Sequence, residues 1–317
     1  MAGKAFASQS DISDKTVTFS VIGEGLYAYT AQGDPNTGII VGDDSCMVID
    51  AQATPLMAQD VIARVRAVTD KPIKYVLLSH YHAVRVLGAS AYGASEIVAH
   101  EATRKLIVER GAEDMASEIG RFPRLFRGVD TVPGLTWPTL TFAGSLTLWL
   151  GKRRVEISHP GRGHTAGDTI AWVPDAGVLY SGDLVEYKSA CYCGDGFLKE
   201  WPHTIGRLAA LDPVALVPGR GDALVGSATA KAAMAGTADF LNALFGTAER
   251  AVARGLSLKE TAAAVRAEMD KPFGDYAIYE HCLPFNVSRA YDEARGIDWP
   301  RIWTDERDVA MWTALQD

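Results

Sequence analysis

Two histidines follow a stretch of the chain that predicts a buried strand. Residues 75–78 are Tyr-Val-Leu-Leu, and His80 and His82 come shortly after them. Aliphatic and β-branched runs of this length are typical of strands that are buried in a sheet. Histidines at positions i and i+2 just beyond a strand can turn both imidazoles toward one ion. The segment therefore predicts a metal-binding turn at a strand end, and the fold has to bring further ligands to the same place.

Three later segments also place a polar residue after a predicted strand. His164 lies in a G-H-T motif, Asp183 ends an S-G-D motif, and Arg220 lies in P-G-R-G. Taken in order with the paired histidines, these segments resemble the metallo-β-lactamase superfamily. The resemblance extends over roughly residues 16–226. It implies an α/β fold, the αββα sandwich of that superfamily.

The resemblance implies one intact metal site. In the superfamily a first metal ion takes both histidines of H-x-H and the histidine of G-H-T, which here are His80, His82 and His164. The aspartate of S-G-D, here Asp183, stands at the position that bridges two sites and is a further candidate ligand. Three histidines suit zinc, whereas two histidines with Asp183 would suit ferrous iron. We expect one divalent metal as cofactor, with zinc favoured and iron as the alternative.

The second metal site of the superfamily has lost its ligands. The usual first motif is H-x-H-x-D-H, but Val84 and Arg85 occupy its last two ligand positions, and Arg220 stands where a late histidine is usual. Guanidinium groups bind carboxylate, sulfate or phosphate through paired hydrogen bonds. We expect Arg85 and Arg220 to anchor an anionic group of a small-molecule substrate, or to stabilise an oxyanion during catalysis. Alternatively, each arginine pairs with an acid such as Asp183 or Asp222 and fills the space.

Other side chains are candidates for the reaction itself. Val84 cannot orient a water or pass on a proton, so Asp183 is a candidate catalytic base. Tyr187 and Tyr192 lie in the loop after Asp183 and are expected to contact the substrate, the alternative being an aromatic lining of the pocket. His281 can reach the site from the C-terminal part of the chain, although a structural role is the stronger alternative.

Asp168 is a candidate partner of the metal-binding histidines. It lies four residues after His164, and a metal-binding histidine usually donates its other N–H group to an acceptor such as a carboxylate. The same carboxylate can instead cap the turn at Thr165. The sequence leaves both interpretations open.

The composition is that of a globular protein and excludes several classes. The 317 residues suffice for one large core, and 48% are hydrophobic while 22% are charged. A net charge of −8 argues against nucleic-acid binding, and no apolar run reaches the roughly 18 residues of a membrane span. Residues 1–16 are polar, without a secretory signal, and no C-x-x-C pair occurs. We expect a cytoplasmic protein that binds neither nucleic acid nor membrane.

The character of the chain changes near residue 226. Up to this point short strand-like segments alternate with a few helices, whereas the rest is rich in alanine and predicts helices, with a capping box at Ser257 and Glu260. We predict a metallo-β-lactamase-like domain at residues 1–226 and a helical C-terminal extension at residues 227–317. The extension is expected to pack on the site or cover it, and its helices can also form a homodimer.

One part of the first domain is hard to assign. Residues 99–111 predict a helix that leaves a short strand. Residues 111–137 carry no clear period and are expected to form a loop with helical pieces over the site.

Three functions fit these observations. The first is a mononuclear metal-dependent hydrolase that uses metal-activated water on a small anionic ester, lactone, thioester or amide. The second is a mononuclear iron oxygenase or lyase, similar to the persulfide dioxygenase branch of the superfamily, although that branch keeps the D-H residues that are replaced here. The third is a non-catalytic member that binds a ligand in a remodelled pocket. We favour the hydrolase.

Overall fold

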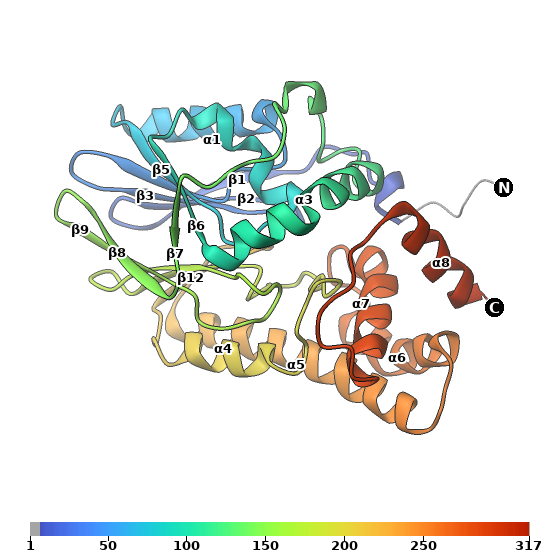
Figure 1. Cartoon of the computed structure of the whole chain (residues 1–317). Helices are drawn as coiled ribbons and strands as arrows, with labels where there is room; N and C mark the ends of the chain where they lie inside the picture. Colours follow the sequence, from blue (N-terminus) through green and yellow to red (C-terminus); the bar gives the residue numbers. More distant parts are fainter. Residues whose placement is uncertain (1–6, 317) are drawn as a thin grey trace.

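The computed structural model describes residues 7–316. At its centre two β-sheets pack face to face, and helices lie on their outer sides (Figure 1). Helix α1 (Pro55–Val68) covers the first sheet, while α4 (Trp201–Ala209) and α5 (Ser227–Ala253) cover the second. This order of layers confirms the αββα sandwich. Residues 1–6 belong to the N-terminal stretch for which we expect no secretory signal, and they lie outside the described residues, as does residue 317.

Each sheet combines parallel and antiparallel strands. In the first sheet β4, β5, β6 and β7 run parallel, and in the second β11 and β12 run parallel. The first sheet follows chain order: β1 Val17–Gly23, β2 Leu26–Ala31, β3 Thr37–Val41, β4 Cys46–Ile49, β5 Ile73–Leu77, β6 Glu96–His100 and β7 Leu140–Phe142. The second sheet has the order β13 Leu224–Val225, β12 Ala215–Pro218, β11 Val178–Gly182, β10 Ile170–Val173, β9 Arg153–Ser158 and β8 Ser145–Leu150.

Apolar side chains fill the space between the layers. Leu26 and Met47 of the first sheet and Val155 and Ile157 of the second are fully buried in one cluster between the sheets. A second cluster joins α1 to the outer face of the first sheet. A third joins the second sheet to the C-terminal helices. Close packing of this kind fixes the positions of the strand ends that carry the site.

Local signals start the helices where the sequence predicts them. The Thr54 hydroxyl accepts the Met57 N–H at the N-terminus of α1, and Pro55 is the first helical residue. Ser257 and Glu260 form a reciprocal capping box at the start of α6 (Leu258–Phe273).

Helix α3 (Glu101–Arg121) differs from the prediction, because it continues well beyond residue 111. Gly111 lies inside the helix, where a Cβ atom would approach the Leu135 side chain at 3.6 Å. The later half of the helix is fixed by tertiary contacts: carboxylates of Asp114 and Glu118 accept the N–H groups of Ala83 and Val84 at 2.8 and 2.9 Å. Those N–H groups begin the short helix α2 (Ala83–Val86) and have no partner within it. Two N–H donors at the start of α2 therefore hold the part of α3 that extends beyond residue 111.

The C-terminal extension does not have a core of its own. It comprises α5, α6, α7 (Tyr279–Ala294) and α8 (Asp305–Gln316), which lie beside and below the second sheet (Figure 1). Leu216 of β12 and Phe285 of α7 belong to the same buried cluster. The remaining short elements are the 3-10 helices Ala7–Ser10, Leu87–Tyr92 and Val129–Thr131.

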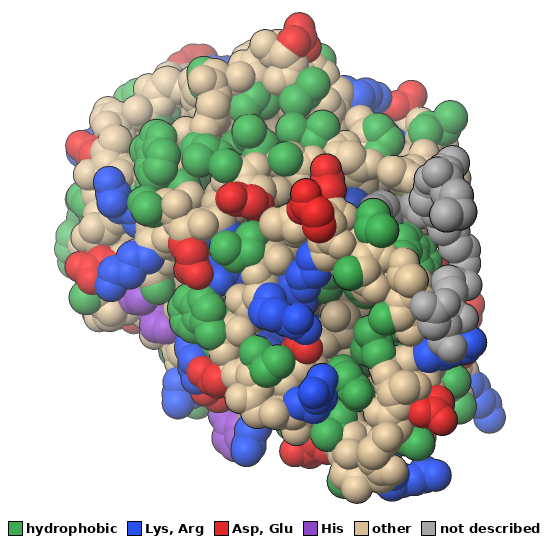
Figure 2. Space-filling model, turned by 45° about the vertical axis from the view of Figure 1, so that its right-hand side comes forward, with side chains coloured by type: hydrophobic (Ala, Val, Ile, Leu, Met, Phe, Trp, Pro, Cys, Tyr) green, Lys and Arg blue, Asp and Glu red, His purple; other side chains and the backbone are tan. Residues whose placement is uncertain are grey.

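The surface carries charges of both signs. On the face drawn in Figure 2, basic and acidic side chains are interspersed with hydrophobic ones. Among the helices within residues 7–316, none combines the length and the apolar character that crossing a bilayer requires. The four cysteines are free and buried.

Candidate metal centre

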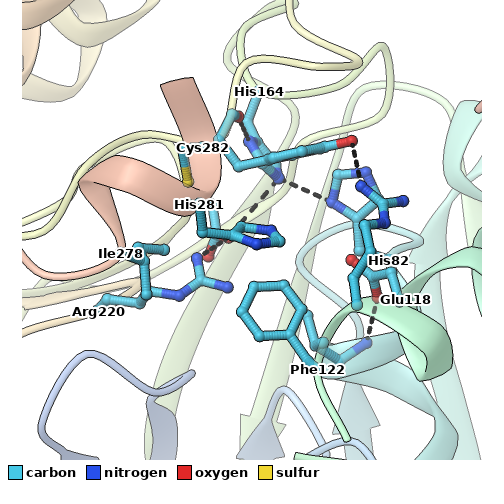
Figure 3. A pocket seen from close by; sticks show the side chains of 12 residues that line it. His82, Glu118, Phe122, His164, Arg220, Ile278, His281 and Cys282 are labelled. Carbon is cyan, nitrogen blue, oxygen red and sulfur yellow. Dashed lines mark hydrogen bonds and ion pairs between the residues drawn. The ribbon is translucent and has the colours of Figure 1, made fainter. Parts of the chain in front are cut away.

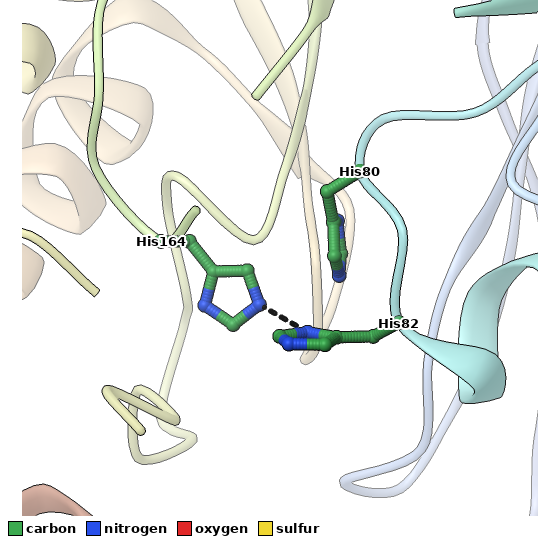
Figure 4. A group of neighbouring side chains, drawn as sticks. All are labelled: His80, His82 and His164. Carbon is green, nitrogen blue, oxygen red and sulfur yellow. Dashed lines mark hydrogen bonds between the residues drawn. The ribbon is translucent and has the colours of Figure 1, made fainter. Parts of the chain in front are cut away.

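Three buried histidines meet at one end of the sandwich (Figure 4). His80 and His82 follow β5, and His164 lies in the loop between β9 and β10. Their candidate ligand nitrogens all lie within 4.8 Å of one another. The ring centroids are 4.5 to 4.8 Å apart, and each pair of rings is nearly perpendicular. The structure thus brings together the three histidines that the sequence singles out.

Each histidine ring is held from outside by its other nitrogen. The contacts are His80 Nδ1 to Ser79 Oγ at 2.8 Å, His82 Nε2 to Asp195 Oδ2 at 3.2 Å, and His164 Nδ1 to the Tyr192 carbonyl oxygen at 2.8 Å. Ser79 donates its own proton to Asp50 at 2.8 Å, so its oxygen is free to accept from the ring. Acceptors in these positions place the ring protons on the outer nitrogens and turn the inner nitrogens toward the centre.

The inner nitrogens fit a bound cation. His82 Nδ1 and His164 Nε2 face each other at 2.9 Å, and in neutral rings with protonated outer nitrogens both carry lone pairs. Two lone pairs at this distance repel each other unless a cation or an additional proton lies between them. His80 Nε2 is buried and has no hydrogen-bond partner among residues 7–316. Three converging imidazole nitrogens are a donor set that zinc prefers.

The electrostatic environment also suits a cation. Burial lowers the pKa of His80 well below its usual range and that of His164 to about 3, so both rings are neutral and able to donate lone pairs. Burial acts in the same direction on His82, but the carboxylates of Asp114 and Asp195 outweigh it and raise its pKa to about 9. The same negative potential that would hold a proton on His82 attracts a metal ion.

Asp183 stands beside the histidines and is bound by two arginines. Its Oδ2 lies 3.6 Å from His164 Nε2 and 3.9 Å from His80 Nε2. Arg85 donates to Oδ1, and Arg220 donates to Oδ2 at 3.0 Å. Burial acts to raise the pKa of this carboxyl, but the two guanidiniums hold it well below its usual range. Asp183 is therefore an ionised carboxylate with one guanidinium bound to each oxygen.

Asp168 caps a turn. Both of its carboxylate oxygens accept the Thr165 N–H at 3.0 Å, and Oδ1 also accepts the Thr165 hydroxyl at 2.7 Å. The outer partners of the ligand histidines are instead Ser79, Asp195 and the Tyr192 carbonyl. Asp168 thus fixes the loop that carries His164 without contacting its ring nitrogens.

A narrow pocket lies beside the histidine cluster (Figure 3). Its free space is about 10 Å³, which is roughly the volume that holds one water molecule. The lining residues are His82, Val84, Glu118, Arg121, Phe122, His164, Asp183, Tyr192, Arg220, Ile278, His281 and Cys282. The walls therefore come from α3 and the residue after it, from the loops that follow β5, β9, β11 and β12, and from the start of α7.

The pocket contains some of the predicted substrate contacts. Tyr192, Arg220 and His281 line it, and Figure 3 shows His281 and Arg220 side by side at its edge. Arg85 lies behind Asp183, where it also donates to the carbonyl oxygens of Asn36 and Gly219. Tyr187 lines a neighbouring cavity of about 140 Å³. The arginines thus adopt the acid-pairing arrangement that the sequence leaves open as the alternative, with Arg220 also bound to Glu186 at 3.1 Å.

More than half of the chain matches one protein family. Residues 31–220 match the profile of the metallo-beta-lactamase superfamily, a span that contains all three histidines and Asp183. The chain belongs to the metallo-β-lactamase superfamily. The matched span ends before α5, so the helical extension lies outside it.

Individual relatives agree with this assignment. Proteins described as metallo-beta-lactamase type 2 from Bacillus sp. (strain 170) and from Bacillus cereus are each 24% identical over 202 residues, which cover 60% of this chain and 70% of theirs. A solved structure of a metallo-beta-lactamase from Pontibacter korlensis has a TM-score of 0.57 and 21% identity, and covers 72% of this chain and 99% of its own. The fold of the matched part of the chain is thus that of the superfamily.

Several site residues of this superfamily member are not evident from its sequence. Glu118 and Arg121 lie on the part of α3 that is not predicted, and Phe122 follows directly after the helix. Asp195 lies in a glycine-containing loop. A signal for α3 exists in the spacing of Asp114, Glu118 and Arg121, which places three charged residues on one helix face. Charged residues at this spacing usually indicate a solvent-exposed face, and here they are buried.

Proposed function

We propose that this protein is a mononuclear metal-dependent hydrolase that acts on a small ester, lactone, thioester or amide carrying an anionic group. The observation that carries the proposal is the convergence of His80 Nε2, His82 Nδ1 and His164 Nε2 beside a pocket. Membership of the superfamily supports it. The names of the curated relatives, metallo-beta-lactamases, agree with hydrolysis in general.

The histidines would hold one divalent cation, with zinc favoured by the donor set. A cation held there supplies Lewis acidity that polarises a carbonyl oxygen and makes a water molecule more acidic. The chain itself orients the imidazoles through their outer acceptors and excludes bulk water by burial. Asp183 contributes negative charge that faces the centre, 3.6 Å from His164 Nε2. Because its oxygens are both bound by guanidiniums, we assign it an electrostatic and anchoring role instead of that of a base.

A single metal ion is supported by the groups around Asp183. The superfamily positions for a second ion are occupied by Val84, which has no ligand atom, and by the guanidiniums of Arg85 and Arg220. Both guanidiniums contact the carboxylate that would otherwise bridge two ions. Their positive charge replaces that of a second cation in balancing Asp183.

Metal analysis combined with a substrate survey tests the proposal. Protein purified without added metal is expected to contain about one zinc per chain, and to hydrolyse at least one member of a panel of carboxylate-bearing esters, lactones, thioesters and amides. His164→Ala is expected to lose both properties, whereas His203→Ala, an exposed residue on α4, is expected to keep them. One iron per chain with oxygen consumption would point to an oxygenase. Metal-free protein that tolerates His80→Ala would point to a binding protein.

Arg220 provides a second, kinetic test. Because it lines the pocket and binds Asp183, Arg220→Met is expected to raise KM or lower kcat strongly while the metal content stays at one. Kinetic constants equal to those of the wild type, with every substrate that is hydrolysed, would contradict a role for this residue in the reaction.

A further inference from the structure

Arg121 differs from the other buried arginines of the described chain. The guanidiniums of Arg85, Arg110, Arg124, Arg220 and Arg289 each have a carboxylate within 4.0 Å. Arg121 is only 2% exposed, yet within residues 7–316 no carboxylate lies at ion-pair distance from it. Burial disfavours this charge, while Tyr192, Glu118 and Asp308 favour it and raise the pKa of Arg121. Neither of these two carboxylates is close enough to bind the guanidinium directly, so its hydrogen bonds decide whether it can take a further anion.

The hydrogen bonds of Arg121 leave one of its nitrogens free. Nε donates to the Ser117 carbonyl oxygen at 3.3 Å, and Nη1 donates to the Tyr192 hydroxyl at 3.3 Å. Nη2 is buried and has no hydrogen-bond partner among the described residues. Arg121 Cζ lies over the rings of Phe285 and Tyr192, 4.5 and 5.9 Å from their centroids. These rings offset part of the cost of burying the charge, but they do not accept the free N–H groups.

Arg121 lines the same pocket as the metal centre. Tyr192 connects the two, because its ring centroid lies 5.5 Å from that of His82 and its hydroxyl accepts from Arg121. Since the Tyr192 hydroxyl accepts this bond, its own proton is available to donate. Arg121 Nη2 and the Tyr192 hydroxyl can therefore both donate to one anion. The ring that carries this hydroxyl lies 5.5 Å from the His82 ring, measured between centroids.

We propose that Arg121, together with Tyr192, binds the carboxylate of the substrate, an assignment that rests on the proposed hydrolase function. Arg220 is less suited to this role because its Nη1 already donates to Asp183 and Glu186. We infer a carboxylate because two neighbouring donors, a guanidinium N–H and a hydroxyl, match its two oxygens. The substrate is then a short acyl compound in which only a few bonds separate the carboxylate from the bond that is hydrolysed.

Titration with acetate tests the assignment directly. Metal-loaded full-length protein is titrated with sodium acetate against a sodium chloride blank of equal ionic strength, and binding is followed through the acetate methyl signal in NMR. Wild-type protein is expected to bind acetate saturably. Arg121→Gln is expected to weaken binding by about tenfold or more, because a charged hydrogen bond is lost. Arg121→Lys, which keeps the charge, is expected to weaken it less.

Controls separate this role from folding and from the metal. Arg104→Gln changes an exposed arginine of the same helix and is expected to bind acetate as the wild type does. Metal content is measured in every variant. A wild type that holds no metal would defeat the hydrolase proposal. The dependence of acetate binding on Arg121 could still be measured in that case, so the two proposals can fail separately. Equal acetate affinity in wild type, Arg121→Gln and Arg121→Lys would overturn the assignment, since acetate would then bind the cation or another group. Saturable binding of phosphate or sulfate but not of acetate would also overturn it.

Discussion

Asp195 Oδ2 lies 3.2 Å from His82 Nε2, on the side of the ring that faces away from the metal centre. The other carboxylate oxygen accepts from Arg110 Nη1 at 2.9 Å. The C-terminal extension holds both Arg110 and the loop that carries Asp195. Arg110 donates to the Pro300 carbonyl at 3.1 Å, and Trp303 Nε1 donates to the carbonyl of Gly194, next to Asp195, at 3.1 Å. The extension is therefore connected to a ligand histidine through two hydrogen-bonded residues.

This relationship predicts that Asp195→Asn weakens metal binding. Removing the carboxylate charge makes the His82 ring less basic and relaxes the preference for an unprotonated Nδ1. Loss of such an outer partner typically costs about 10- to 100-fold in metal affinity. The zinc dissociation constant is measured by competition with a chromophoric chelator, and Asp298→Asn, at an exposed acid, serves as the control. Equal affinities in all three proteins would mean that the ring is oriented without Asp195.

Metal removal is expected to destabilise the folded protein. A cation that binds only the folded chain adds about 2.7 kcal/mol to the free energy of unfolding when its free concentration is 100 times its dissociation constant. Urea unfolding with and without a chelator measures this difference. His164→Ala provides the matched control, since its stability should not respond to the chelator. A wild type that also shows no response would mean that no cation binds at the three histidines.

Sequence and structure agree where local patterns specify the outcome. The strands follow from periodicity within short stretches of chain. The αββα layers and the grouping of His80, His82 and His164 follow from the family resemblance that the short motifs carry. Arg121 lies on a helix whose length depends on contacts with α2, which no local pattern contains. Asp195 reaches His82 across 113 residues of sequence. Pairings over such separations depend on the packed fold, so the residues that complete the site could not be predicted from local patterns.

Arg85 is predicted to be a structural ion-pair residue that contributes strongly to stability. It is buried, binds Asp183, and donates to the carbonyl oxygens of Asn36 and Gly219. Arg85→Met removes these three hydrogen bonds and leaves Asp183 with Arg220 as its remaining guanidinium partner. Breaking a buried ion pair in this way costs about 3–5 kcal/mol.

The free energy of unfolding in urea measures the effect of Arg85→Met. Arg154→Met is the control, because Arg154 pairs with Glu156 at the surface and exposed pairs contribute about 0–1 kcal/mol. Similar losses in the two variants would show that the interaction of Arg85 with Asp183 is energetically equivalent to a surface pair.

Two glycine substitutions are predicted to have opposite effects on stability. A Cβ atom on Gly219 would overlap Asp183 Oδ1 and lie 2.8 Å from Asp183 Cα, so Gly219→Ala has to displace the carboxylate that binds both arginines. Overpacking of this kind typically costs about 1–3 kcal/mol, and zinc affinity should fall with it because Asp183 faces the ligand histidines. Gly206 lies within α4 with open space around it, and Gly206→Ala should add about 0.4–1 kcal/mol by restricting the unfolded chain. Urea unfolding measures the stability of both variants, and zinc titration measures their affinity for the metal. A Gly219→Ala protein as stable as the wild type would show that the loop after β12 can move away from Asp183.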